Sequence, residues 1–346
     1  MKTAVCARRL LRVLALTVMA AALSLSIVLP TLAAEAIKIG IVRSMGGNPA
    51  FIGREKGFFV AEGLDAELVL FDAAQPIAVA VASGDIDFGS TGMTAAFFTF
   101  ASQGALRIIG AGTWEHPGFQ NIGFLVSNQA YAAGLKGFKD MAGHSVAITQ
   151  LGTPLHYYLA LVVEKYGVDF KTLRILPMQS NPNVQSALTG GQADAGVQTV
   201  APAYAVIERG GAKLLGWFGD ELPARQGEGV FTATKTANER PETVKHFLAA
   251  WRRGQRYFHD AFADANDQRR DGATAAEVLA IAAKNLGQSP EDLKRGIPFI
   301  DPEARVAVKD IAAAIAWYKS QNMLKGEVDA NALVDRRYAL EAPRDR

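Results

Sequence analysis

Apolar residues along the chain follow two periodicities in turn. Short runs rich in β-branched and other apolar residues, such as residues 37–42 and 65–71, predict buried strands. After the first run, a loop leads into a segment with helical apolar spacing that is opened by Pro49 and closed by Gly63. Strands that alternate with helices through short loops predict an α/β fold, with mostly parallel sheets flanked by helices.

One part of this pattern occurs twice. Residues 83–92 (SGDIDFGSTG) return as residues 190–199 (GGQADAGVQT), and two proline-opened helices upstream of each copy return with them. The sequence separation between Asp87 and its counterpart Asp194 is far longer than a solenoid repeat, which has about 20–50 residues. The sequence therefore predicts two similar lobes with a ligand cleft between them.

The repeat also sets the predicted boundaries of the lobes. The first lobe is expected to span residues 35–127 and to be completed by residues 226–346, while the second lobe spans residues 128–225. The chain would cross between them near Ser127 and again near Gly227, and we expect these crossings to form a hinge. Beyond Pro241 the pattern turns helical, with helices expected at residues 242–262, 274–286, 290–295 and 302–321.

Residues 1–34 have the order of a secretory signal peptide. Basic residues precede seventeen nearly all apolar residues at 13–29, and Pro30 and small residues follow. A single membrane anchor is the alternative, because a run of this length reaches the lower limit for spanning a bilayer. Polar residues within the run favour cleavage, after Ala34, and export to the periplasm; Arg8 and Arg9 also leave a twin-arginine signal open.

The leader accounts for the apparent basicity of the chain. The whole chain has 36 Lys and Arg against 34 Asp and Glu, a formal net charge of +2, and residues 1–34 hold four basic and no acidic residues. Removing them changes the charge to −2, which gives no electrostatic signature for nucleic acid or an anionic membrane. The single cysteine, Cys6, lies in the leader, so we expect neither a disulfide nor a cysteine metal site.

Loops that lead into predicted helices are the candidate ligand site. Ligands of parallel α/β sheets bind at the carboxyl ends of strands, where helix N-termini favour anions. Four loops qualify, at residues 43–48, 90–92, 150–153 and 198–201. We predict ligand binding by Arg43, Ser44, Met45, Gly46, Ser90, Thr91, Gly92, Trp114, Glu115, Gly152, Thr153, His156, Gln198 and Thr199. For the short polar residues, and above all for Thr153, capping of their own helices is the alternative. A packed aromatic in a surface loop is the alternative for Trp114, a structural role for His156, and a surface ion pair for Arg43.

The chain carries no catalytic motif with the right context. Ser145 begins a predicted strand, whereas a nucleophile elbow needs its serine at a strand-to-helix turn. The five histidines lack metal-ligand spacing, and no phosphate loop or dinucleotide fingerprint is present. We therefore predict a protein that is not an enzyme and uses no cofactor or metal. Asp87 and Asp194 are interpreted as structural, because a ligand would need different chemistry from each lobe.

Five segments together resemble one protein family. They are residues 37–40 (IKIG), 55–59 (EKGFF), 82–89 (ASGDIDFG), 190–195 (GGQADA) and 240–244 (RPETV). The likeness covers most of the chain beyond residue 34 and is to the periplasmic substrate-binding proteins of bacterial ABC importers for nitrate, taurine, aliphatic sulfonates and thiamine precursors. It implies a type II binding-protein fold that closes on a small anionic ligand. It also implies a monomer that delivers this ligand to a permease and its ATPase at the inner membrane.

One departure from this family concerns the ligand. Many relatives carry Trp, an acidic residue and Pro after the second Asp-Ala, whereas residues 196–202 read GVQTVAP here. The missing acidic group argues against an amine-bearing ligand such as taurine. We expect a small organic anion, a sulfonate, carboxylate or nitrate-like compound. The alternatives are an enzyme on the same fold, acting on a thiamine-pyrimidine or chorismate-derived compound, and a sensory binding protein without transport.

Overall fold

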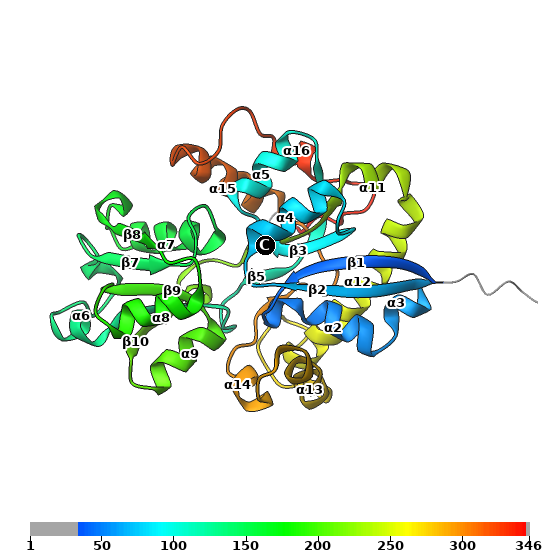
Figure 1. Ribbon diagram of the computed structural model, residues 1–346. Helices are drawn as coiled ribbons and strands as arrows, with labels where there is room; N and C mark the ends of the chain where they lie inside the picture. The colour runs from blue at the N-terminus through cyan, green and yellow to red at the C-terminus, as the bar shows by residue number, and fades with distance from the viewer. Residues whose placement is uncertain (1–33, 344–346) are drawn as a thin grey trace, which may run out of the picture. The chain divides into compact units, whose positions relative to one another are not determined.

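Two five-stranded sheets, each flanked by helices, organise residues 34–343, which are the residues that the computed structural model describes (Figure 1). The predicted signal peptide, apart from its last residue Ala34, lies outside these residues. Within them, no helix has the length and apolar character needed to cross a membrane. The α/β fold class predicted from the sequence is confirmed.

The first sheet has the strand order β2-β1-β3-β12-β4. Its strands are β1 (Glu35–Val42), β2 (Leu64–Phe71), β3 (Phe88–Gly92), β4 (Leu106–Ala111) and β12 (Glu228–Ala233). Strands β1, β2 and β3 are parallel, and β12 runs antiparallel between β3 and β4. In β1, Ile37, Ile39 and Ile41 are buried because alternate side chains of a strand face the same side.

Helices from both ends of the sequence surround this sheet, either directly or packed on other helices. They are α2 (Asn48–Glu55), α3 (Phe58–Ala61), α4 (Ala74–Ser83), α5 (Ala95–Ser102), α11 (Thr234–Glu239), α12 (Pro241–Phe262), α13 (Ala275–Leu286) and α14 (Pro290–Lys294). The single helix expected from Pro49 to Gly63 is divided in two, because Gly57 takes a left-handed conformation with φ of +69°. On α12, Phe247 stacks on Phe88 of β3 with ring centroids 3.8 Å apart, which anchors the long helix to the sheet.

The second sheet repeats the topology of the first, in the order β8-β7-β9-β6-β10. Its strands are β6 (Ile122–Ser127), β7 (Ser145–Ile148), β8 (Arg174–Pro177), β9 (Ala195–Thr199) and β10 (Ala212–Trp217). The prediction that residues 122–127 belong to the first lobe is wrong, because β6 pairs with β9 and β10. The antiparallel strand of each sheet is therefore the strand that follows a crossing, β6 in one sheet and β12 in the other.

Shorter helices surround the second sheet. They are α6 (Asn128–Ala132), α7 (Pro154–Lys165), α8 (Asn181–Thr189), α9 (Val200–Glu208) and α10 (Phe218–Glu221), with 3-10 turns at Phe138–Asp140 and Phe170–Thr172. We call this sheet with its helices, residues 122–217, lobe 2. Lobe 1 is the first sheet with α2 to α5 and α11 to α14. In Figure 1, lobe 2 is green and lies to the left of the blue strands of lobe 1.

A third, small sheet contains both crossings. Strand β5 (Thr113–Glu115) lies between β11 (Arg225–Gln226) and β13 (Phe299–Ile300). Strands β5 and β11 are antiparallel, and Glu115 lies opposite Arg225. The first crossing thus lies between β4 and β6, earlier than the predicted position near Ser127. We call β5 and β11 the connector strands.

The C-terminal helices are α15 (Val308–Ser320) and α16 (Ala330–Leu333). The helix predicted from residue 302 begins later, because the Asp301 carboxylate accepts the backbone N–H groups of Glu303 and Arg305 and holds them in a turn. Helix α15 contacts both α5 of lobe 1 and α7 of lobe 2. The ring centroid of its Tyr318 lies 6.0 Å from that of Phe98 in α5 and 6.2 Å from that of Tyr157 in α7, and the two lobes therefore share an apolar core.

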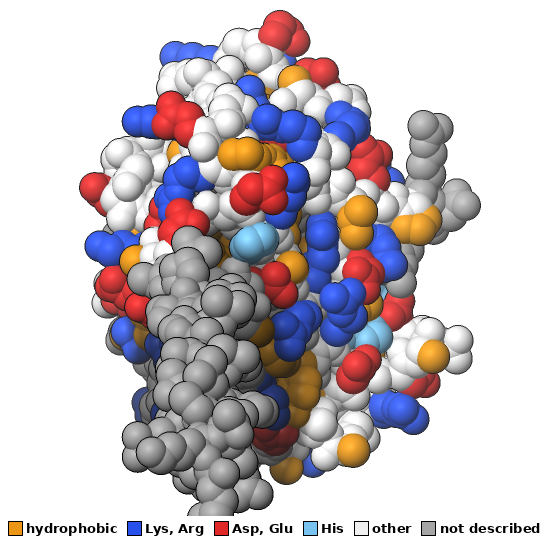
Figure 2. Space-filling view, turned by 90° about the vertical axis from the view of Figure 1, so that its right-hand side faces the viewer, with side chains coloured by type: hydrophobic (Ala, Val, Ile, Leu, Met, Phe, Trp, Pro, Cys, Tyr) orange, Lys and Arg blue, Asp and Glu red, His pale blue; other side chains and the backbone are white. Residues whose placement is uncertain are grey.

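Charges on the face shown in Figure 2 are mixed. Lys and Arg side chains alternate with Asp and Glu side chains, and neither sign gathers into a continuous field. The part of this face that is drawn in colour therefore gives no sign of a polyanion-binding patch.

Candidate ligand-binding site

A cavity of about 540 Å³ opens where the strand ends of both lobes meet the connector strands. Lobe 1 contributes Arg43 and Ser44 after β1 and Thr91 at the end of β3, and lobe 2 contributes Thr153 and Thr199. The size is that of a site for a small organic molecule. The predicted cleft between two lobes therefore corresponds to a real cavity.

The N-termini of four helices meet at this cavity. The N-cap residues of α4, α7, α8 and α9 belong to its lining, and they are Ala73, Thr153, Ser180 and Thr199. The Ser180 side chain caps α8 by accepting the Asn183 N–H, whereas the other three N-cap residues make no side-chain capping bond. Helix N-termini carry partial positive charge and unpaired N–H groups, so this arrangement suits an anionic group.

Half of the residues predicted from the sequence line this cavity. They are Arg43, Ser44, Thr91, Gly92, Glu115, Thr153 and Thr199. Met45 and Gly46 line a smaller cavity of about 100 Å³, to which Arg43 and Ser44 also belong. The candidate loops of the two lobes are thus brought together, as their matching places in the repeat predict.

Two predicted residues point away from the cavity because of strand alternation. On β5, Glu115 lines the cavity, so its neighbour Trp114 faces the other way and is 1 % exposed in the core of lobe 1. Ser90 is buried on β3 beside Thr91, which does line the cavity. An aromatic wall built by Trp114 is therefore absent from the described lining.

Three further predicted residues support the site from behind. The Gly152 carbonyl accepts the Ala95 N–H at 2.8 Å, a contact between lobe 2 and lobe 1. Gln198 donates to the Asn181 carbonyl at 2.9 Å and so holds the start of α8. His156 is buried against Trp317 of α15, and this burial lowers its pKa to about 4.

The capping interpretation is wrong for three of the predicted residues. Ser44, Thr153 and Thr199 are N-cap residues, yet none of their side chains accepts a capping bond. The Thr153 hydroxyl donates instead to the Gln150 carbonyl at 3.0 Å. Thr91 Oγ1 is buried and has no hydrogen-bond partner among the described residues. These hydroxyl groups are thus not engaged in holding their own helices.

Sequence reasoning missed several lining residues. The starts of α4 and α8 belong to the cavity, and the repeated pairs Gln75-Pro76 and Asn181-Pro182 could have indicated them, since they open matching helices. Tyr158 lies one turn after Pro154 on the same helix face. Glu228 had no sequence signal, because nothing local distinguishes it from a surface acid at a strand start.

The cavity has an acidic wall at the connector strands. Burial raises the pKa of Glu115 to about 8, against a hydrogen bond from Asn121 and with a further increase from the charge of Glu228. Burial also raises the pKa of Glu228, against hydrogen bonds from Thr113. Arg43, which also lines the cavity, lies 3.7 Å from the exposed Asp72 carboxylate.

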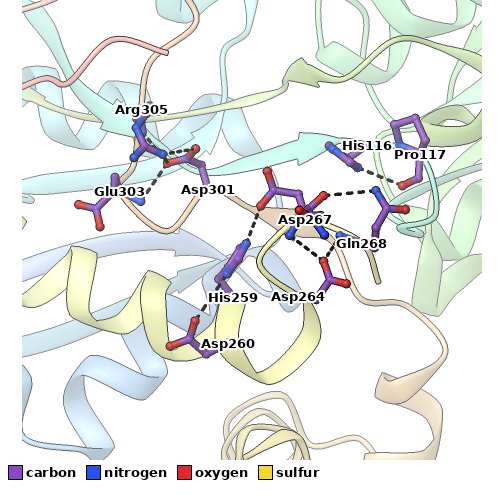
Figure 3. Close-up of polar contacts among 11 residues, drawn as sticks. His116, Pro117, His259, Asp260, Asp264, Asp267, Gln268, Asp301, Glu303 and Arg305 are labelled. Atoms are coloured by element: carbon purple, nitrogen blue, oxygen red, sulfur yellow. Dashed lines mark hydrogen bonds and ion pairs between the residues drawn. The ribbon is translucent and has the colours of Figure 1, made fainter. Parts of the chain in front are cut away.

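A second polar cluster lies away from the cavity, around the loop that follows α12 (Figure 3). His259 Nε2 lies 2.9 Å from Asp267, and Asp264 accepts the N–H groups of Asn266 and Gln268. These contacts fold the loop onto α12. Among residues 34–343, no group of three His, Cys, Asp or Glu side chains could hold a metal ion.

Solved structures similar to this one have the fold of periplasmic binding proteins. The periplasmic aliphatic sulphonate binding protein SsuA from Escherichia coli superposes with a TM-score of 0.68 at 19% identity, over 88% of this chain and 98% of that chain. The desulfurization enzyme DSZB gives a TM-score of 0.62 at 16% identity, over 88% and 97%. The fold is therefore that of two-lobed binding proteins, and an enzyme also uses it.

The sequence assigns the chain to a family within this class. Residues 48–264, more than half of the chain, match the family described as NMT1/THI5 like, and the chain belongs to it. A candidate binding protein of Brucella abortus (strain 2308) is 26% identical over 218 residues. That match covers 62% of this chain and 64% of the relative, so the chain spans less than two thirds of the relative's length.

Proposed function

We propose that the protein is the solute-binding component of a bacterial ABC importer. It captures a small organic anion, such as a sulfonate, carboxylate or nitrate-like compound, in the periplasm and delivers it as a monomer to the permease and its ATPase. The observation that carries this proposal is the convergence of four helix N-termini from both lobes on one small-molecule cavity. The likeness to the sulphonate binding protein supports it at the level of the fold.

Capture is proposed to occur by hinge closure at the connector strands. Strands β5 and β11 join the lobes and pair with each other over two residues, so a rotation there changes few backbone hydrogen bonds. Closure would bring the N-termini of α4 in lobe 1 and of α7, α8 and α9 in lobe 2 onto the same anionic group. The ligand would then bridge the lobes and stabilise the closed form.

The test combines binding with a measurement of size. Protein without residues 1–34 is screened by thermal shift against sulfonates, nitrate, aromatic acids and pyrimidines, and each ligand that raises the melting temperature is examined by small-angle X-ray scattering. We expect an anion to raise the melting temperature and to reduce the radius of gyration. A ligand that stabilises the protein without compaction would contradict hinge closure. Mass spectrometry of compounds that co-purify identifies the natural ligand.

The enzyme and sensor alternatives lead to different observations. The described lining of the cavity contains no histidine, since His156 lies behind it. A product peak after incubation with thiamine-pyrimidine or chorismate-derived compounds would favour an enzyme. Uptake that depends on this protein and an adjacent permease would favour import over sensing.

A further inference from the structure

Two carboxyl groups form the connector side of the cavity. Glu115 ends β5 and Glu228 begins β12, so the two acids come from the two strands that carry the chain out of lobe 1 and back into it. Both residues belong to the cavity lining. The acids therefore lie at the point where the ligand and the hinge meet.

The backbone around Glu228 makes room for its carboxylate. A Cβ atom placed on Gly46 would lie 3.0 Å from Glu228 Oε2, and one placed on Gly112 would lie 2.9 Å from the same oxygen. The Thr113 N–H donates to this oxygen at 3.3 Å. Two glycines and one amide thus hold this carboxylate beside the cavity.

Glu115 is more deeply buried and only partly satisfied. Its side chain is 1 % exposed, and Oε1 accepts a hydrogen bond from Asn121 Nδ2 at 2.5 Å. The Ile122 backbone N–H also acts on this carboxyl group and lowers its pKa, while Oε2 is buried and makes no hydrogen bond of ordinary geometry within residues 34–343. An unpaired buried carboxyl oxygen is costly to leave unsatisfied, and once Glu115 has lost its proton this oxygen favours a ligand that donates to it.

Nearby basic groups do not neutralise the two acids. Arg225 lies opposite Glu115 on β11, and its charge lowers the Glu115 pKa less than burial and the Glu228 charge raise it. No ion pair joins Arg225 or any other basic side chain of the described residues to Glu115 or Glu228. Of these two acids in one wall, Glu115 keeps its proton at neutral pH, and a cationic partner could take the place of that proton.

We propose that Glu115 and Glu228 form a subsite for a protonated nitrogen of the ligand. The ligand would be a small organic acid that also carries an ammonium or amidinium group. Its anionic head would lie at the helix N-termini, and its nitrogen would lie between the two glutamates. This inference rests on the proposed function, since it assigns the opposite end of the same ligand. The lack of an acidic residue in residues 196–202 argued against an amine-bearing ligand. Glu115 and Glu228, from a different part of the chain, would supply the acidic groups that such a ligand needs.

Proton release follows from this assignment. Glu115, with a pKa of about 8, is protonated at neutral pH and would give up its proton when a cation binds beside it. The charged or titratable groups that face it are Glu228, Arg225 and Tyr158. Binding of an aminated acid should therefore strengthen as the pH rises toward 8, provided that the ligand nitrogen stays protonated.

The test uses matched ligand pairs that differ only at the nitrogen. Isothermal titration compares taurine with isethionate and 4-(aminomethyl)benzoate with 4-methylbenzoate, on wild type and on the double variant Glu115→Gln, Glu228→Gln. In at least one pair we expect the aminated acid to bind about tenfold more tightly than its partner to the wild type. The double variant should lose this preference and keep its affinity for the unaminated acid. Asp310→Asn is the control and should change neither, because Asp310 is a half-buried acid outside the lining that accepts the Gln226 N–H.

The outcomes separate this inference from the proposed function. Equal or tighter binding of the unaminated acids would overturn the subsite and leave an anion-binding protein. Binding of benzylamine, sensitive to the double variant, with no binding of any acid would support the subsite and overturn the anionic ligand. No heat from any of the compounds, with the circular dichroism spectrum of a folded protein, would overturn both.

Discussion

The two lobes repeat one carboxylate contact but secure it in different ways. In lobe 1, Asp87 accepts the backbone N–H of Lys38 at 2.7 Å, and in lobe 2, Asp194 accepts that of Ser145 at 2.8 Å. Each aspartate thus joins the turn before the third strand of its lobe to the first strand. The prediction that the repeated aspartates build the fold is confirmed, since each carboxylate accepts a backbone N–H of a strand.

The remaining partners of the two aspartates differ. Asp87 forms an ion pair with Arg240 at the start of α12, and Arg240 also binds Glu35 at 2.6 Å. Asp194 instead accepts the Ser145 hydroxyl at 2.8 Å and lies 3.2 Å from His144, both within lobe 2. Lobe 1 is therefore completed by a segment that follows the second crossing, whereas lobe 2 is built from one continuous stretch. The contact between the aspartate and the first strand is thus the same in both lobes, whereas the other groups that hold the aspartate differ.

The largest expected effect is on the pH dependence of the unfolding free energy, and it comes from Glu115 on the connector strand β5 and not from either lobe. The Glu115 pKa is raised from 4.5 to about 8, so its stabilising contribution is complete below about pH 4.5 and is lost as the pH rises through about 8. The upper limit of this loss is roughly 5 kcal/mol, at 1.36 kcal/mol for each unit of pKa. Glu115→Gln should flatten the fall in the unfolding free energy between about pH 5 and about pH 9, measured in urea. An unchanged slope would contradict this.

Asp194 should act at the acid end instead. Burial pushes its pKa up, but hydrogen bonds from the Ser145 backbone and hydroxyl and from His144 outweigh this, so its pKa lies below the usual value. Its contribution is present above the ordinary pKa of aspartate and is lost as the pH falls through the lowered pKa. Asp194→Asn should flatten the acid limb and leave the alkaline limb as in the wild type.

Truncation of the aspartates tests the comparison directly. Asp87→Ala removes the acceptor of an amide and leaves the partly buried Arg240 without one partner, and we expect a loss of about 3 kcal/mol in unfolding free energy. Asp194→Ala should cost about 2 kcal/mol, because its partners are mostly neutral donors. Asp85→Ala, an exposed neighbour in the same turn, is the control and should stay within about 0.5 kcal/mol. A larger loss at Asp194 than at Asp87 would reverse the comparison.

The smallest effect on stability comes from the hydroxyl groups that face the cavity. Thr91→Val removes a buried hydroxyl without a partner, so the unfolding free energy should change by less than about 0.5 kcal/mol. If Thr91 binds the ligand, affinity should fall about tenfold, measured by titration with the anion found in the thermal-shift screen. Thr232→Val removes a buried hydroxyl that donates to the Asp87 carbonyl at 2.7 Å and should show the opposite balance. Lost stability without lost affinity at Thr91 would assign it to the fold.

The sequence predicted most elements because prolines and glycines mark their ends. It could not place β6, because the partner of an antiparallel strand that follows a crossing is decided by the distant strands β9 and β10. It could not show which side chains of β5 lie in the core and which line the cavity, because three residues are too few to reveal an alternation of apolar and polar positions. His156 falls behind the cavity because Trp317, far away in sequence, covers it.

Because β5 is short, the part of the cavity wall that it forms can change only in limited ways. Trp114 and Glu115 are neighbours with opposite surroundings, hydrocarbon for the indole and the ligand cavity for the carboxyl. Insertion or deletion of one residue in this strand would exchange the two, with a carboxyl in the core and an indole in the cavity. Ligand selectivity on the β5 side of the cavity can therefore change through substitutions. A change in the length of this strand would alter stability and ligand recognition together.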